Sequence, residues 1–183
     1  MFSPKREIML LKNNPISFKN RIKELFFDYL VILLYLALLF GVSMAAYHLF
    51  FKGIPIMNET QSQLIALLTS VIPLILIFAY LDYSKDGSIG KRKASLKLVY
   101  KHKSFQASFI RNFIKFLPWQ IGHMSTIHGI YTDFDRWAIV LFFVSIGFAV
   151  LLLLMGFMRH DKRHLGDLLA HSQVQLAELL QNP

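Results

Sequence analysis

The sequence contains no cysteine and few charged residues for its length. Of its 183 residues, 17% are Asp, Glu, Lys or Arg, whereas a soluble domain has roughly 25%. Hydrophobic residues make up 55% of the chain, and Phe alone occurs 17 times. The absence of cysteine excludes disulfides, iron–sulfur clusters and cysteine zinc sites. The many aromatic residues exclude intrinsic disorder, and too few polar groups remain to cover a soluble surface. The composition therefore indicates a membrane protein.

The sequence also lacks the short motifs of the common catalytic classes. It contains no HExxH, GxSxG, P-loop or GxGxxG motif, so metalloproteases, serine hydrolases and nucleotide-binding enzymes are not indicated. Accordingly, we expect no enzymatic activity, no cofactor and no metal site.

Three apolar stretches, at about 25–51, 64–82 and 137–158, are long enough to cross a bilayer as helices. A span needs about 20 largely apolar residues. Pro73 lies in the second stretch, and membrane helices tolerate proline because a neighbouring group can bond the freed carbonyl. Trp137 begins the third stretch, at a position typical of the aromatic belt.

A fourth stretch, at about 109–131, contains Arg111, Lys115, Gln120, His123 and His128 as well as Pro118, so hydropathy alone leaves it ambiguous. Lys and Arg collect on the cytoplasmic side of membrane proteins. Six precede the first stretch, seven lie between residues 85 and 103, and three lie between 159 and 163: Lys5, Arg6, Lys12, Lys19, Arg21, Lys23, Lys85, Lys91, Arg92, Lys93, Lys97, Lys101, Lys103, Arg159, Lys162 and Arg163. Only four spans place all three groups on one side.

We therefore predict an all-α membrane protein with a single domain over residues 1–183. It is a four-helix transmembrane bundle with a broken or tilted third helix, a basic cytoplasmic loop and both termini in the cytoplasm. A cleaved signal peptide is the weaker interpretation of the first stretch, because its basic leader is long and Asp28 interrupts its start. The net charge of +9 fits anionic lipid headgroups at the basic loop rather than nucleic acid.

Arg21 and Asp28 are the first candidate site residues. Seven residues form nearly two helical turns, so the two side chains share a face but lie about 10 Å apart along the axis. Because an ionisable group inside a span is costly unless paired or hydrated, a partner from another segment or water must accompany Asp28. The pair is either a structural clasp or a site where Asp28 binds a cation or a proton.

Arg111 and Lys115 share a helix face at i and i+4. They could extend to the cytoplasmic headgroups, line a hydrated path, or pair with Asp28. His123 could relay protons, since histidine titrates near pH 6.5. Its five-residue spacing to His128 is poor for a metal pair.

The tail after residue 158 contains Arg163 and Asp167, which are i, i+4 partners if this segment is helical. A stripe of leucines predicts an interfacial amphipathic helix here: Leu165, Leu168, Leu169, Leu176, Leu179 and Leu180.

Together these features resemble the RDD family of small bacterial membrane proteins, named for one arginine and two aspartates. Arg21 and Asp28 match the family's opening arginine and its first aspartate. Residues 88–92 (SIGKR) are similar to the T-P-G-K-R turn, and residues 111–119 (RNFIKFLPW) to the R-N-x-x-K-F-L-P-W opening of the third span. Residues 165–172 (LGDLLAHS) are similar to L-H-D-x-L-A-G-T, which gives Asp167 the place of the second aspartate.

The chain departs from the family pattern at four positions. Glu24 stands where a small residue is usual, Ile89 replaces the proline of the turn, Gly166 replaces a histidine, and His171 replaces a glycine. A role of that histidine elsewhere in the family would be missing here.

The resemblance implies a multi-pass protein of the bacterial inner membrane with an unassigned molecular function. Transport of a small solute, or cation–proton exchange, is the first hypothesis, with Arg21, Asp28 and Asp167 as the site. The alternative is a non-transporting regulator or scaffold. The expected partner is accordingly another copy of the chain or a different membrane protein. The resemblance also implies that 96–99 and 172–175 pair as short strands, although local periodicity favours a helix for the second.

Overall fold

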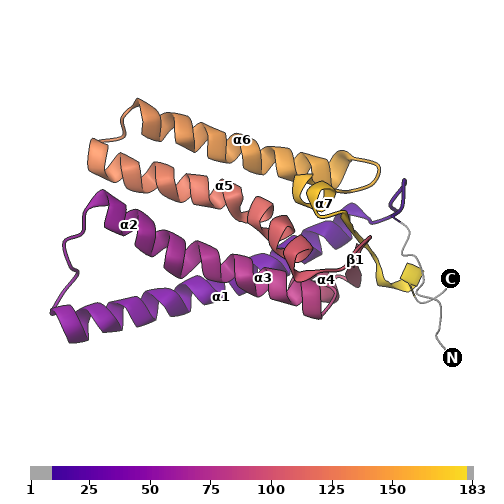
Figure 1. The fold of residues 1–183 in the computed structure, drawn as a ribbon, viewed down its shortest axis with the longest axis horizontal. Coiled ribbons are helices and arrows are strands. Elements are labelled where there is room, and N and C mark those ends of the chain that lie inside the picture. Colours follow the sequence, from indigo (N-terminus) through magenta and orange to yellow (C-terminus); the bar gives the residue numbers. More distant parts are fainter. Residues whose placement is uncertain (1–9, 181–183) are drawn as a thin grey trace.

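The computed structural model describes residues 10–180, which form a helical bundle with a small sheet at one end (Figure 1). The order of its elements is α1 (Phe18–Phe51), α2 (Glu59–Ala66), the π-helix η1 (Leu67–Val71), α3 (Ile72–Ser84), α4 (Ile89–Lys93), β1 (Leu96–Tyr100), α5 (Phe105–Thr132), α6 (Arg136–Met158), α7 (Leu165–Leu169), β2 (Ser172–Leu176) and the 3₁₀-helix η2 (Ala177–Leu180). Lys5 and Arg6 of the first basic group lie outside the described residues.

Three helical stretches within residues 10–180 are long and apolar enough to cross a membrane: Phe18–Phe51, Glu59–Ser84 and Arg136–Met158. They correspond to the three apolar stretches of the sequence. The fourth stretch lies in α5, which contains 28 residues against 23 in α6 but carries more polar side chains. All four long helices run along the bundle (Figure 1).

The second stretch is one helix whose middle is a π-helical turn just before Pro73. Proline has no N–H to donate to the carbonyl of Thr69, four residues earlier. The Tyr35 hydroxyl of α1 donates to that carbonyl instead. A neighbouring helix thus bonds the freed carbonyl, as expected.

α5 is a continuous helix through Pro118, so of the two expected forms, broken or tilted, the broken one is wrong. α6 packs along it after a short connection (Figure 1). The Ser145 hydroxyl of α6 donates to the carbonyl of Pro118 at 2.7 Å, and the Ser125 hydroxyl of α5 donates to the carbonyl of Ala138 at 2.7 Å. These bonds hold the two helices together at two levels.

β1 and β2 form an antiparallel sheet in which Leu96 lies opposite Leu176 and Tyr100 opposite Ser172. Leu96, Leu98 and Val174 belong to its buried apolar core. The strand pairing is therefore confirmed, while the all-α prediction misses this sheet. The amphipathic helix predicted from the leucine stripe is wrong, because the segment divides into α7, β2 and η2. Residues of β2 are buried on both faces, a pattern that helical spacing does not describe.

We call the end of the bundle that contains β1 and β2 the sheet end. The segment before α1 and the strand β2 both lie there, and the connections 52–58 and 133–135 lie at the opposite end (Figure 1). A second apolar core, with Leu74, Phe78 and Phe116 at its centre, joins α3 to α5. This core fixes the two helices that supply opposite charges to the site.

Candidate functional site: a buried ionic network

Eight charged side chains meet inside the bundle near its sheet end, and we call them the ionic network. Salt bridges of 2.6–3.5 Å connect its four acidic and four basic groups, which come from five helices: Glu24, Asp28, Asp82, Asp167, Arg21, Lys91, Arg111 and Lys115. With every group ionised, the charges cancel. This balance is what makes burial of so many charges tolerable in an apolar bundle.

Asp28 is 3% exposed and receives three donors, none of them from Arg21. The Ser88 hydroxyl donates to Oδ2 at 2.8 Å, and the Gly90 N–H donates to Oδ1 at 2.9 Å. The ammonium of Lys115 lies 3.3 Å from Oδ2. The partner required from another segment is therefore a lysine of α5, one of the alternatives that the sequence left open.

Gly90 lets α4 approach α1 closely enough to reach Asp28. A Cβ atom at this position would lie 2.1 Å from the carbonyl oxygen of Glu24 and 2.6 Å from Asp28 Oδ1. Any side chain would push the two helices apart. The glycine of the SIGKR turn is thus required for the hydrogen bonds to Asp28.

Arg21 binds within its own helix and to the tail. Its Nη1 lies 2.9 Å from Glu24 Oε2, and its Nη2 donates to the carbonyl of Lys162 at 2.8 Å. Its buried Nε has no hydrogen-bond partner in the described part of the chain. Glu24 also lies 3.5 Å from Lys91. The residue that departs from the family pattern therefore supplies the charge partner of Arg21.

Arg111 is 2% exposed and bridges two acids. Its Nη1 lies 2.7 Å from Asp82 Oδ2, and its Nε lies 2.6 Å from Asp167 Oδ1. Arg111 thus connects α3, α5 and α7, and the alternative in which it extends to headgroups is wrong. Asn112 donates to the same Asp82 oxygen at 2.9 Å.

Asp82 and Lys91 are members of the site that the sequence analysis missed. Lys91 is fully buried, with its ammonium 3.3 Å from Asp82 and 3.2 Å from the Ser88 hydroxyl. It was counted among the basic residues that face headgroups, which is wrong for this lysine. The sequence contains one signal for Asp82. It is an acid directly after an apolar run, and a later stretch that could span the membrane contains Arg111.

His164 fixes the position of Asp167. The Gly166 N–H donates to Nδ1 of His164 at 3.0 Å, so Nδ1 carries no proton. Nε2 of the ring lies 3.3 Å from Asp167 Oδ2 and 3.3 Å from Nη2 of Arg111. Burial lowers the pKa of His164 to about 4. Burial also opposes ionisation of Asp167, but the nearby Arg111 outweighs it and holds the pKa of that carboxyl below its usual range.

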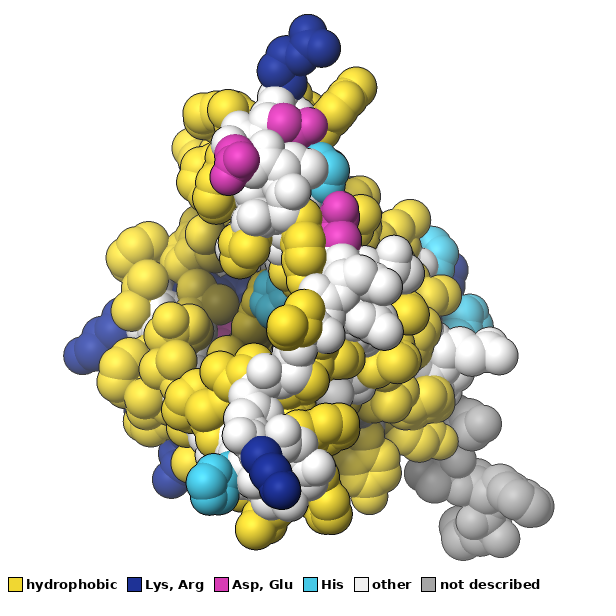
Figure 2. Space-filling model, turned by 90° about the vertical axis from the view of Figure 1, so that its left-hand side faces the viewer, with side chains coloured by type: hydrophobic (Ala, Val, Ile, Leu, Met, Phe, Trp, Pro, Cys, Tyr) yellow, Lys and Arg dark blue, Asp and Glu magenta, His cyan; other side chains and the backbone are white. Residues whose placement is uncertain are grey.

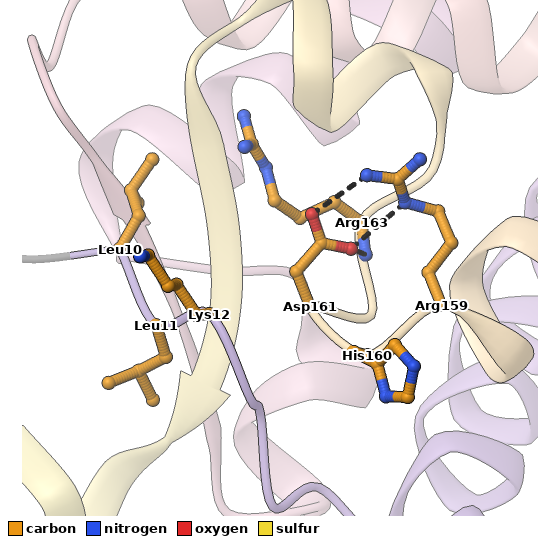
Figure 3. A pocket seen from close by; sticks show the side chains of 7 residues that line it. All are labelled: Leu10, Leu11, Lys12, Arg159, His160, Asp161 and Arg163. Atoms are coloured by element: carbon orange, nitrogen blue, oxygen red, sulfur yellow. Dashed lines mark hydrogen bonds and ion pairs between the residues drawn. The ribbon is translucent and has the colours of Figure 1, made fainter.

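Arg163 does not bind the Asp167 carboxylate, contrary to the expected i, i+4 pair. Its guanidinium donates to two backbone carbonyls, of Asp167 at 3.0 Å and of Ser172 at 2.8 Å. Arg163 lines a surface pocket of about 480 Å³. Figure 3 shows this pocket between the segment before α1 and the turn where Arg159 binds Asp161. Arg163 therefore supports the backbone beside the ionic network.

His123 lies along α5 away from the salt bridges, and its Nε2 accepts a hydrogen bond from Trp119 Nε1. The expected contribution of His123 to a site with Asp28 finds no contact among the described residues. Within residues 10–180, no group of three or more His, Asp or Glu residues could hold a metal ion.

Two pockets reach the ionic network. The larger, of about 550 Å³, lies between α1, α5 and α6 and has Arg21, Arg111 and Lys115 among its lining residues. The smaller, of about 390 Å³, is lined by Asp28 and Lys115 with apolar residues of α1. In Figure 2, which looks at the end opposite the sheet, basic and acidic atoms lie at the bottom of a recess with apolar walls.

Comparison with protein-family models finds a match to the RDD family over residues 16–171. No curated protein and no solved structure matches the chain.

Proposed function

The chain belongs to the RDD family, and from this premise we propose that it exchanges a small cation for protons across the bacterial inner membrane. In this proposal, Asp28 is the carboxylate that binds the cation, and Lys115 is the group that competes with the cation for it. The ionic network around Arg111 holds the helices in place.

The proposal includes four membrane spans, with the sheet end in the cytoplasm. α5 has 28 residues, so at 1.5 Å per residue it is about 42 Å long, which exceeds a hydrocarbon core of about 30 Å. Its most polar positions, Arg111 and Asn112, are buried inside the protein. The hydropathy of α5 therefore underestimates how apolar its outer surface is.

The single observation that carries the proposal is the contrast between two ion pairs. Lys115 lies 3.3 Å from Asp28, its side chain is 22% exposed, and it borders both pockets. Arg111 lies within 2.7 Å of two acids and is almost completely buried. Asp28 is thus the carboxylate from which a cation can most easily displace the protein's own positive charge.

The exchange balances in charge. When a cation M⁺ binds the Asp28 carboxylate, Lys115 loses its partner. An unpaired ammonium is costly in apolar surroundings, so Lys115 releases one proton and becomes a neutral amine. The site carries the same net charge before and after this step. Return of a proton to Lys115 restores the pair and releases M⁺, which couples cation movement to proton movement in the opposite direction.

The test is proton flux in liposomes that contain the purified protein and a pH-sensitive dye. After addition of Na⁺, K⁺ or Li⁺, we expect a pH change with the wild type and none with Asp28→Asn. Asp86→Asn is the matched control, since Asp86 is an exposed acid paired with Lys103 outside the network. Equal flux from wild type and Asp28→Asn would refute the proposal.

A continuous path for the cation requires more than one copy of the chain, because four helices of this length do not enclose one. We therefore propose a homo-oligomer. The exposed basic residues of the connection around β1, Arg92, Lys93, Lys101 and Lys103, would contact anionic headgroups at the cytoplasmic surface.

A second function, that of a non-transporting regulator or scaffold, is favoured by the completeness of the pairing. Each of the four acids already has a cationic partner, as in a structural clasp. Under this alternative, liposomes show no cation-driven flux, and mild detergent extracts contain the protein bound to a different membrane protein in fixed stoichiometry.

A further inference from the structure

The larger pocket lies between α1, α5 and α6, and its walls are mostly apolar. Its lining includes Ile32 of α1, Trp119 of α5 and Leu152 of α6. The rings of Phe18 and Phe157, whose centroids are 4.9 Å apart, join α1 to α6 at the sheet end. The volume of about 550 Å³ falls in the range of roughly 300–1,000 Å³ that is usual for small-molecule sites.

Positive charge is concentrated at the sheet end of this pocket. Arg21, Arg111 and Lys115 line it together with a single acid, Glu24. The other three acids of the ionic network are not among its lining residues. The pocket therefore presents more positive than negative charge to an occupant, although the network as a whole is neutral.

Arg21 supplies the second, independent observation. Its side chain is nine-tenths buried, yet its Nε has no hydrogen-bond partner in the described part of the chain. A buried donor without an acceptor costs free energy, and a small shift of the guanidinium would bring it to an anionic oxygen at this end of the pocket, which Arg21 lines. Lys115, which is 22% exposed, lines the same pocket.

From this arrangement we infer that the pocket between α1, α5 and α6 binds one membrane lipid with an anionic headgroup. The headgroup phosphate lies beside Arg21 and Lys115, and an acyl chain lies along the apolar walls. An amphiphile with an anionic end matches both parts of the pocket. The inference is independent of transport, because it concerns binding and would hold for a scaffold as well.

The experiment counts retained lipids by native mass spectrometry after reconstitution in nanodiscs of phosphatidylglycerol and phosphatidylcholine in equal amounts. We expect the wild type to retain one phosphatidylglycerol. Gly156→Leu fills the pocket, because Gly156 lines it and a Cβ there meets no atom within 4 Å. We expect retention to weaken roughly tenfold or more, which corresponds to about 1.4 kcal/mol.

Gly147→Leu is the matched control, since Gly147 lies on the same helix, also has no atom within 4 Å of an added Cβ, and does not line the pocket. It should retain the lipid as the wild type does, and Lys115→Gln should reduce the preference for phosphatidylglycerol. Equal retention of both lipids, or unchanged retention by Gly156→Leu, would overturn the inference. Displacement of the lipid by inorganic phosphate alone would identify a simple anion site instead. Dissociation of an oligomer by Gly156→Leu, without lipid loss, would show that a second copy fills the pocket.

Discussion

Replacing Gly90 by alanine should destabilise the protein strongly, although it adds only one methyl group. The new Cβ would lie 2.1 Å from the backbone carbonyl of Glu24 and 2.6 Å from Asp28 Oδ1. Backbone cannot yield as a flexible side chain can, so α4 must move away from α1. Overpacking typically costs 1–3 kcal/mol, and losing the 2.9 Å Gly90 N–H bond to a carboxylate costs about 1.5–3 kcal/mol more. We expect a total loss of roughly 2.5–6 kcal/mol.

The assay is unfolding in detergent micelles by titration with sodium dodecyl sulfate, followed by the fluorescence of the two tryptophans. Gly147→Ala is the control, because an added Cβ there meets nothing within 4 Å. It should be neutral or slightly stabilising, since alanine favours a helix over glycine. If Gly90→Ala proved as stable as Gly147→Ala, the close approach of α4 to Asp28 would be refuted.

Three further substitutions test other contacts. Arg111→Lys should cost roughly 3–5 kcal/mol in the same unfolding assay, because a lysine cannot reach both acids and leaves a buried charge unpaired; stability equal to wild type would contradict the bridging geometry. The low pKa of His164, about 4 against 6.5 in the unfolded chain, means that the unfolded state binds more protons between these values. Stability should therefore fall as the pH falls from 6.5 to 4, by up to about 3 kcal/mol, and His164→Gln should flatten this dependence in a pH series of unfolding curves. Tyr35→Phe should cost about 1 kcal/mol by removing the donor to the Thr69 carbonyl, but much less in a Pro73→Ala background, where the backbone supplies a donor.

The sequence predicts the long elements, and it leaves one central ion pair among its alternatives. Apolar runs locate the three candidate spans because a helix in a bilayer must bury its backbone bonds and expose apolar side chains. Asp28 required a cationic partner on energetic grounds, and Lys115, one of the candidates, is that partner. Pro73 similarly required a donor from another helix, and Tyr35 supplies it.

The remaining members of the site depend on pairings that are distant in sequence. Asp82 stands at the border of a span and Lys91 in a basic loop. Local composition at both places is typical of exposed charges. Their burial follows only from the folding of α4 back against α1. The leucine stripe after residue 164 suggested a helix, but pairing with β1 overrides local periodicity. Periodicity reports one exposed and one buried face, and β2 has no exposed face.

The central claim is that Lys115 of α5 holds Asp28 of α1 as a direct charge pair. A double-mutant cycle of Asp28→Asn and Lys115→Met in the unfolding assay tests it most directly, with Asp28→Asn and Lys52→Met as the uncoupled control cycle. We predict a coupling energy of roughly 1–3 kcal/mol for the first cycle. The double variant should lose less stability than the sum of the losses of the two single variants. In the control cycle the two losses should add within about 0.5 kcal/mol. Additive losses in both cycles would contradict the claim.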